Sequence, residues 1–274
     1  MSEKKEKNKE KKMTFWQHLE ELRWVIIYSF ISILIGSTVS FIFKNFVFNS
    51  IILAPKNPDF ITNDLLCRLS DILSIKSICI NSHPLEIINI DLAGQFYIHI
   101  FISITTGVII SAPIILWLLW RFIKPALLEK EKKHTKGTVL ITSILFYIGI
   151  AFSYFIIVPL TINFLGNYQV SEFINNRISL SSYVHTIVSL SFAVGIVFEL
   201  PAIVYFLTKT GIINSIMMKK NRKIVFVILL IISAIITPPD VFSQLLVCFP
   251  LVLLYELSIN ISKRIEKKNN LLQG

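Results

Sequence analysis

The sequence predicts an all-α, polytopic membrane protein with six transmembrane helices and both termini on the cytoplasmic side. Of its 274 residues, 54% are hydrophobic and only 16% are charged, whereas soluble domains average about 45–50% apolar and about 25% charged residues. The apolar residues form blocks of membrane-spanning length. With six spans, 22 of the 27 lysines and arginines lie on one side, as expected for cytoplasmic loops. The net charge of +10 therefore indicates topology rather than nucleic-acid binding.

The first residues precede any membrane span. Residues 1–13 are lysine-rich and mixed with glutamate, and they contain no apolar stretch. They lack the character of a secretory signal or a transit peptide, so we expect a disordered, basic cytoplasmic tail. Residues 14–23 place apolar and polar side chains on opposite faces of a short helix, which is typical of a segment lying in the headgroup layer.

A single membrane domain is expected over residues 14–264, followed by a cytoplasmic tail at 265–274. Prolines kink helices, and four of the blocks contain one each, so we expect a curved, open bundle rather than straight rods. The predicted spans are about 24–43, 96–120, 137–160, 182–208, 224–237 and 241–259, with prolines at Pro113, Pro159, Pro201 and Pro250.

The last apolar region is either one broken span or two short spans joined by a turn. Pro238 and Pro239 interrupt it and are followed by Asp240. Adjacent prolines stop a helix, and an aspartate at mid-membrane would cost about 2.5–3.5 kcal/mol. Both features cost little in a turn outside the membrane. We therefore predict an outer hairpin between two short final spans, which also keeps the basic C-terminal residues inside.

Several uncommon strings occur in order along the chain. They are His18–Arg23 (HLEELR), Ser111–Pro113 (SAP), Trp120–Leu127 (WRFIKPAL), Leu145–Phe155 (LFYIGIAFSYF), Phe198–Pro201 (FELP) and Thr237–Gln244 (TPPDVFSQ). This series resembles the TatC family, the signal-peptide receptor subunit of the twin-arginine protein translocase, over about residues 14–264. The first outer loop, Lys44–Gln95, is longer than is usual in the family and resembles it only at Ala54–Pro55. No family role is therefore assigned to this loop.

The resemblance implies a binding site for paired arginines on the cytoplasmic face. A guanidinium pairs best with a carboxylate, often through two parallel hydrogen bonds. Glu21 matches the acid of the first motif and Glu131 that of the first cytoplasmic loop, while Glu20 and Glu129 are neighbours that could substitute for them. Arg23 is expected to orient or anchor the site. The alternative is that these glutamates are ordinary surface charges at helix ends, since exposed glutamate is common.

Glu199 lies ten residues before Lys209, so a helix places it about 15 Å from the inner surface, near mid-membrane. Intramembrane acids usually face a partner, a cavity or an ion path. Three roles remain open from the residues: a carboxyl bonded to a neighbouring span, a proton carrier, and the polar docking patch for small partner subunits that the resemblance implies.

Three other groups carry weaker expectations. Asp240 is either a turn residue or a functional acid of the outer hairpin, and Glu256 either snorkels to the surface or pairs with Lys263. Cys67 and Cys79 lie twelve positions apart in the outer loop, where a disulfide would form in an oxidising compartment.

Taken together, the resemblance implies a receptor and scaffold that binds twin-arginine signal peptides of folded proteins and recruits TatA- and TatB-like single-span subunits in an oligomeric complex. Export would draw on the proton gradient, without cofactor or enzymatic activity; no GxxxxGK[ST] phosphate loop is present. The alternative function is a secondary transporter of a small solute or ion with Glu199 as its coupling acid. A bacterial inner membrane is favoured, and the alternatives are a thylakoid or mitochondrial inner membrane with the protein encoded in the organelle.

Overall fold

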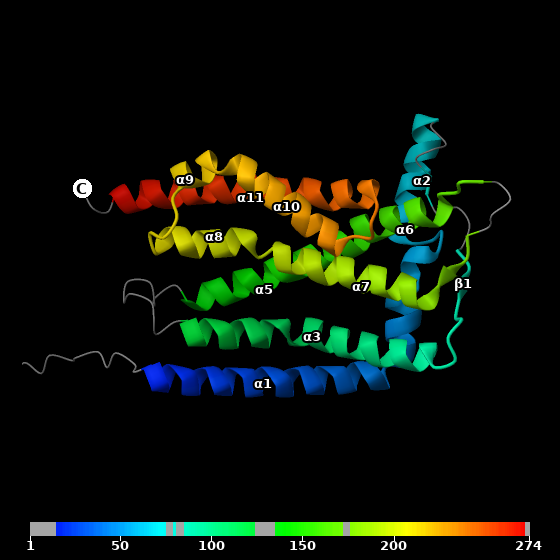
Figure 1. Cartoon of the computed structure of the whole chain (residues 1–274), viewed down its shortest axis with the longest axis horizontal. Coiled ribbons are helices and arrows are strands. Elements are labelled where there is room, and N and C mark those ends of the chain that lie inside the picture. The colour runs from blue at the N-terminus through cyan, green and yellow to red at the C-terminus, as the bar shows by residue number, and fades with distance from the viewer. Residues whose placement is uncertain (1–14, 75–78, 81–84, 124–134, 172–175, 272–274) are drawn as a thin grey trace, which may run out of the picture.

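The computed structural model describes residues 15–74, 79–80, 85–123, 135–171 and 176–271, and these form a bundle of roughly parallel helices (Figure 1). The first helix α1 (Phe15–Ile42) is followed by α3 (Gly94–Ile123). The third crossing is continuous through α5 (Thr135–Phe152), η5 (Ser153–Ile157) and α6 (Val158–Asn167), and the fourth comprises α7 (Leu180–Val197) and α8 (Leu200–Lys209). The chain ends with α9 (Ser215–Lys220), α10 (Arg222–Ile236) and α11 (Val241–Leu271).

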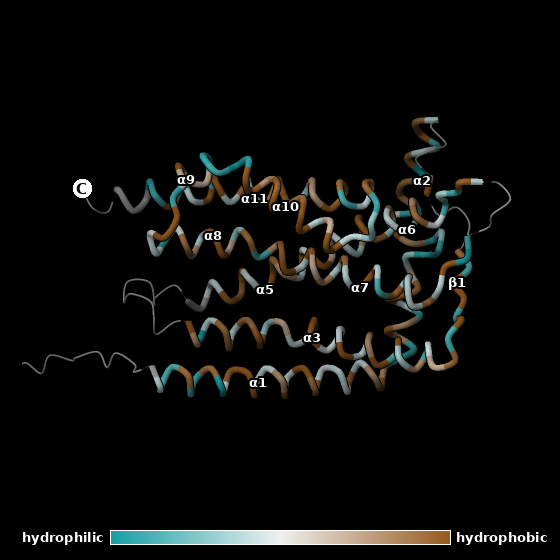
Figure 2. Tube along the Cα trace, viewed as in Figure 1, coloured by the Kyte–Doolittle hydropathy of each residue, from teal (hydrophilic) through white to brown (hydrophobic). Residues whose placement is uncertain are grey.

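The predicted all-α membrane fold is confirmed. Within the described residues, five helices are long and apolar enough to cross a membrane, and α10 is a shorter apolar helix of 15 residues. Hydrophobic residues predominate along these helices (Figure 2). The start of α1 and the end of α11 lie at the same end of the bundle (Figure 1), which we call the terminal end; the opposite end is the distal end.

The final helix is longer than the predicted span 241–259. It begins at Val241, directly after the predicted turn, and runs 31 residues to Leu271. The apolar pattern ends near Ile261, but the polar residues beyond it remain helical because they contact α9. Glu266 accepts hydrogen bonds from the backbone N–H and the hydroxyl of Ser215, both at 2.5 Å.

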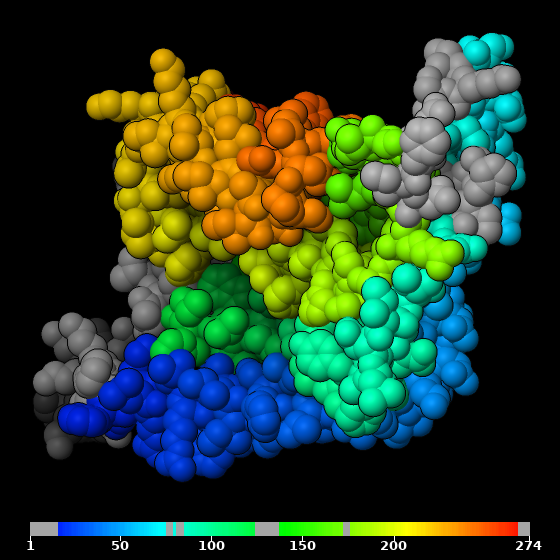
Figure 3. Space-filling view, turned by 45° about the vertical axis from the view of Figure 1, so that its right-hand side comes forward, coloured from blue at the N-terminus to red at the C-terminus, as the bar shows by residue number. Residues whose placement is uncertain are grey.

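Two of the four prolines coincide with irregular helix. Pro159 follows the π-helical turn η5, and Pro201 follows the break between α7 and α8. A proline lacks the N–H that would bond the preceding turn, so the helix widens or breaks there. Pro113 and Pro250 instead lie inside the continuous helices α3 and α11. Figure 3 shows the surface hollowed between α1 and the α8–α9 region, with α5 lying deeper, in agreement with the expected open bundle.

The core is centred on α7, whose inner face is fully buried. Val184, Leu190 and Val194 of this helix have no exposed surface, and they pack with Ile157 and Val158 of the third crossing. The α1–α3 pair is held differently, through small residues. A Cβ built on Gly107 would lie 2.5 Å from the backbone nitrogen of Ser37. This close approach is typical of helix pairs that associate by backbone packing in membranes.

The distal end carries the chain's shortest elements. After α1 the chain passes through η1 (Phe46–Ile52) and η2 (Ala54–Lys56) into α2 (Ile61–Leu73), which lies crosswise to the spans (Figure 1). Cys67 and Cys79 form a disulfide. The two-residue strands β1 (Ile87–Ile88) and β2 (Ile178–Ser179) pair in parallel, and they join the loop before α3 to the loop before α7.

Candidate functional site

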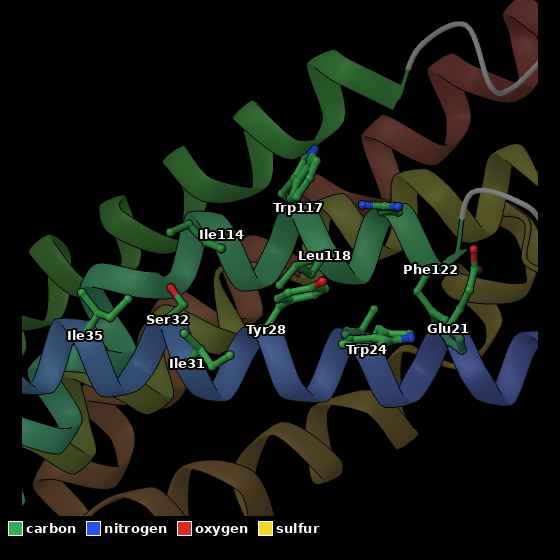
Figure 4. Close-up of a pocket in the computed structure, with 12 residues that line it drawn as sticks. Glu21, Trp24, Tyr28, Ile31, Ser32, Ile35, Ile114, Trp117, Leu118 and Phe122 are labelled. Atoms are coloured by element: carbon green, nitrogen blue, oxygen red, sulfur yellow. The ribbon is translucent and has the colours of Figure 1, made fainter.

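A cavity of about 610 Å³ lies between α1 and α3 near the terminal end. It is mostly apolar and aromatic, with Glu21 and Arg121 as its charged members (Figure 4). The lining comes from two helices and consists of Glu21, Trp24, Val25, Tyr28, Ile31, Ser32 and Ile35 of α1, and Ile114, Trp117, Leu118, Arg121 and Phe122 of α3.

Helical periodicity explains why α1 presents these side chains together. Glu21, Trp24, Tyr28, Ile31 and Ile35 follow one another at intervals of three or four residues, so they share one face of the helix. The indole of Trp24 stacks on the ring of Tyr28, with centroids 5.6 Å apart. The carboxylate of Glu21 therefore stands at the terminal end of a continuous aromatic and aliphatic stripe.

The carboxylate of Glu21 is partly buried and chemically unsatisfied. Its Oε2 atom is shielded from solvent and has no hydrogen-bond partner among the described residues. Glu20 and Arg23, its neighbours in the motif, are exposed. A buried carboxylate oxygen without a donor is costly, so this atom is suited to accept a hydrogen bond from a bound ligand.

Two contacts from α3 shape the surroundings of Glu21. The ring of Phe122 stacks on the imidazole of His18 with centroids 4.1 Å apart, which joins the terminal ends of the two helices. The guanidinium of Arg121 lies over the indole of Trp117, 5.9 Å from the ring centroid. Within the described part of the chain, no ion pair links Arg121 to Glu21, so the carboxylate remains available to a cation.

The second predicted acid, Glu131, lies outside the described residues, as does Glu129. The described residues show only where the chain leaves α3 and where it enters α5. It leaves α3 after Ile123 and enters α5 at Thr135, and both points are at the terminal end (Figure 1). The segment that contains Glu131 is thus attached at the end of the bundle where Glu21 lies.

Glu199 lies at the break between α7 and α8, inside the fourth crossing. It borders a second cavity of about 470 Å³, whose other lining residues are almost all apolar and come from α3, α5, α7 and α8. Its Oε1 atom is buried and has no hydrogen-bond partner among the described residues. The sequence left three roles open for Glu199. Within the described residues, this buried oxygen does not show the first role, a hydrogen bond to a neighbouring span.

Asp240, the acid of the predicted outer hairpin, has a structural role in the turn between α10 and α11. The Oδ1 atom of Asp240 accepts a hydrogen bond of 2.7 Å from the backbone N–H of Ser243, which caps the first turn of α11. Pro238 and Pro239 separate α10 from α11, and the carbonyl of Pro238 accepts a hydrogen bond from the N–H of Asp240. The turn reading of this segment therefore has direct structural support.

Comparisons with known proteins settle the family. The sequence model described as "Sec-independent protein translocase protein (TatC)" matches residues 17–250. The chain belongs to the TatC family. A TatC of Blattabacterium sp. subsp. Periplaneta americana is 40% identical over 96% of this chain and 99% of its own length. For a TatC of Aquifex aeolicus the values are 35%, 95% and 99%.

Solved structures agree with this membership. A crystal structure described as the twin-arginine translocase receptor TatC is 34% identical, with a TM-score of 0.70 over 91% of this chain and 99% of that one. A second, in the detergent DDM, has a TM-score of 0.73 at 35% identity and covers 89% and 99%. The chain is therefore a multi-pass membrane protein and a component of a protein translocase rather than an enzyme.

Sequence reasoning missed the aromatic cavity beside Glu21, and one of its two readings of Glu256 named the wrong partner. The three-and-four spacing that begins at Glu21 was a usable signal for the cavity. Glu256 pairs with Arg222, with the Nη2 and Oε2 atoms 2.7 Å apart, so the expected partner Lys263 is wrong. Arg222 is the first residue of α10, which packs beside α11. The spacing of residues along α11 cannot predict a partner that lies on another helix.

Proposed function

We propose that this TatC-family chain is the receptor and scaffold subunit of a twin-arginine translocase, binding the signal peptides of folded proteins at its terminal end. The description of the similar crystal structures as twin-arginine translocase receptors supports this reading. So does the position of Glu21, which belongs to the motif that first indicated the family.

The single observation that carries the proposal is the unpaired, partly buried carboxylate of Glu21. The terminal end is rich in lysine and arginine, yet the Oε2 atom of Glu21 is shielded from solvent and has no hydrogen-bond partner among the described residues. A guanidinium supplies paired donors in the geometry a carboxylate accepts. We assign one arginine of the signal to Glu21 and the other to Glu131, with Arg23 as an anchor at the membrane surface. The neighbouring acid Glu20 is exposed and does not line the cavity, so we leave it outside the site.

The terminal end is accordingly assigned to the cytoplasm. It carries the loops and tails in which most of the lysines and arginines occur, and cytoplasmic loops of membrane proteins carry that excess. This gives an N-in, C-in topology. The similar TatC proteins named above come from bacteria, which supports a bacterial inner membrane over a thylakoid or mitochondrial one.

The cavity beside Glu199 is proposed as the docking place for TatA- and TatB-like single-span subunits. Its apolar lining suits a transmembrane helix, and the unpaired Oε1 atom suits a polar side chain on that helix. An intramembrane acid satisfied only by a partner would favour assembly. Energy for export would come from the proton gradient. The alternative of a small-solute transporter using Glu199 receives no support from the comparisons.

Photo-crosslinking tests the receptor proposal directly. A signal peptide carries a photoreactive residue beside its two arginines and is irradiated with inverted membrane vesicles containing the full chain. We expect a crosslink to this protein that is lost when both arginines of the peptide become lysines and that is strongly reduced in the Glu21→Gln variant. The matched control Glu20→Gln should keep the crosslink. A crosslink of equal yield with the lysine peptide would overturn the proposal.

A further inference from the structure

The crosswise helix α2 has an exposed apolar face that the proposed function does not use. Ile61, Leu65, Leu69 and Ile72 are 68%, 56%, 39% and 77% exposed. At about 100° per residue these positions fall within roughly 80° of one another around the helix. Four large apolar side chains thus form one narrow stripe, which we call the α2 stripe.

The opposite face of α2 is fastened to the distal loop. Asn63 is fully buried, and its amide donates hydrogen bonds to the carbonyls of Pro55 and Asn57 at 3.1 and 2.8 Å. Ser70 is also buried, and the disulfide from Cys67 to Cys79 leaves the helix on this side. These attachments fix the rotation of α2 about its axis, so the stripe is held outward by the structure.

The charged residues of α2 lie beside the stripe rather than within it. Asp64 pairs with Arg68, with Oδ2 and Nη2 2.9 Å apart, and Asp71 lies about two turns from Asp64 toward the helix end. A helix with one apolar face and one charged face, lying across the spans, has the arrangement of a segment embedded in a membrane surface.

The depth of α2 supports the same placement. The hydroxyl of Thr62 donates a hydrogen bond to the carbonyl of Phe155, and the ring of Phe60 stacks on that of Phe155 at 5.7 Å. Phe155 belongs to η5, so all ten residues of α6 lie between it and the distal tip of the third crossing. Ten helical residues span about 15 Å, so α2 begins well below that tip.

The surface beside this attachment is apolar and exposed. Phe155 and Ile156 are 37% and 42% exposed, and they belong to a helix long and apolar enough to span a membrane. Figure 1 shows α2 running crosswise from there and extending past the side of the bundle. The stripe therefore starts beside the exposed apolar surface of a helix that is long and apolar enough to cross a membrane.

We propose that α2 is an interfacial anchor whose stripe is buried in the lipid leaflet at the distal end, with its rotation set by Asn63 and by the disulfide. The occupant of the stripe is the bilayer rather than a second protein chain. This anchor fixes the height and tilt of the distal loop relative to the membrane, and it is independent of signal-peptide binding.

A photoreactive residue at two positions of α2 tests the proposal. One variant carries benzoylphenylalanine in place of Leu65 in the stripe, and the matched control carries it in place of Asp71 on the charged face. Both side chains are exposed, so neither change opens the core. The full chain is placed without other proteins in nanodiscs of phosphatidylethanolamine and phosphatidylglycerol, irradiated and weighed by intact-mass spectrometry. An intact Cys67–Cys79 disulfide confirms that the distal loop has folded in each variant.

We expect phospholipid adducts at position 65 to exceed those at position 71 several-fold. Equal lipid adducts at the two positions would mean that the stripe has no preferred side, and the proposal would fail. It would also fail if position 65 gave no lipid adduct, or if its main product were a crosslink to a second copy of the chain.

Discussion

The imidazole of His18 lies flat against the ring of Phe122, with centroids 4.1 Å apart and 12° between the planes. His18 belongs to the motif that contains Glu21, and Phe122 precedes the loop that contains Glu131. The stack therefore fastens the two segments that carry the proposed arginine-binding acids. Phe122 also lines the cavity beside Glu21, and Figure 4 shows these two side chains coming from facing helices.

Replacing Glu21 with glutamine should weaken binding of a twin-arginine signal peptide by about 10- to 100-fold. A hydrogen bond to a charged group contributes about 1.5–3 kcal/mol, and each 1.4 kcal/mol corresponds to tenfold in affinity. Glutamine keeps the shape of the side chain but loses its charge and one acceptor. Affinity is measured by fluorescence anisotropy with a labelled signal peptide and the purified chain in nanodiscs.

The exposed neighbour Glu20 provides the matched control. Glu20→Gln removes the same charge one residue away, on a part of α1 that does not line the cavity. We expect less than about a fivefold change, since solvent screening of an exposed charge keeps such effects below about 1 kcal/mol. If both substitutions weakened binding equally, general charge at this end of the chain would account for the affinity, and the specific role of Glu21 would be refuted.

Glu131→Lys should abolish signal-peptide binding while the protein still inserts and folds. A lysine would place a positive charge where a guanidinium is expected, adding repulsion to the loss of the acceptor. The measurement compares signal binding with the yield of folded protein by size-exclusion chromatography. Normal export of a twin-arginine substrate by this variant would remove Glu131 from the site.

Glu199→Ala should leave signal binding unchanged and reduce copurification of single-span partner subunits. The unpaired Oε1 atom borders an apolar cavity within the spans, so its contribution is expected in contacts made inside the membrane. Thr142→Val is the control, since Thr142 lines the same cavity and its hydroxyl already bonds the carbonyl of Val139. Partner recovery equal to that of the unchanged chain would leave Glu199 without a docking role.

The sequence predicted what depends on local pattern. Blocks of apolar residues predicted the spans, because a helix that crosses lipid needs a continuous apolar segment. The Pro238–Pro239–Asp240 string predicted the turn before α11, because adjacent prolines end a helix wherever they occur. It could not predict features that depend on which helices become neighbours. Arg222 rather than Lys263 reaches Glu256 because α10 packs beside α11. How far α11 continues past its apolar block was likewise not predictable, since that part of the helix contacts Ser215.

The candidate site divides along the same line. Glu21 was found from its motif and Glu199 from its position inside an apolar block. Glu21 and Glu199 each have a buried carboxylate oxygen without a hydrogen-bond partner among the described residues. This burial comes from other helices, so it could not be predicted from the spacing of nearby residues. The cavity beside Glu21 requires Trp117 and Arg121 from α3, and only the docking of α1 against α3 brings them there.

Because the cavity depends on that docking, widening the α1–α3 contact should disturb it. A Cβ at Gly107 would meet the backbone nitrogen and Cα of Ser37 at 2.5 and 2.8 Å, and backbone atoms cannot move aside as a flexible side chain can. Gly107→Ala should therefore force the helices apart, at a cost of about 1–3 kcal/mol typical of overpacking.

Gly137→Ala is the matched control, because a Cβ there would meet no atom within 4 Å. Thermal unfolding in detergent should show a lower midpoint for the first variant and no loss for the second. Signal-peptide affinity should fall only with Gly107→Ala. An unchanged midpoint for that variant would show that the α1–α3 contact tolerates a methyl group and that the cavity beside Glu21 is not held by close backbone packing.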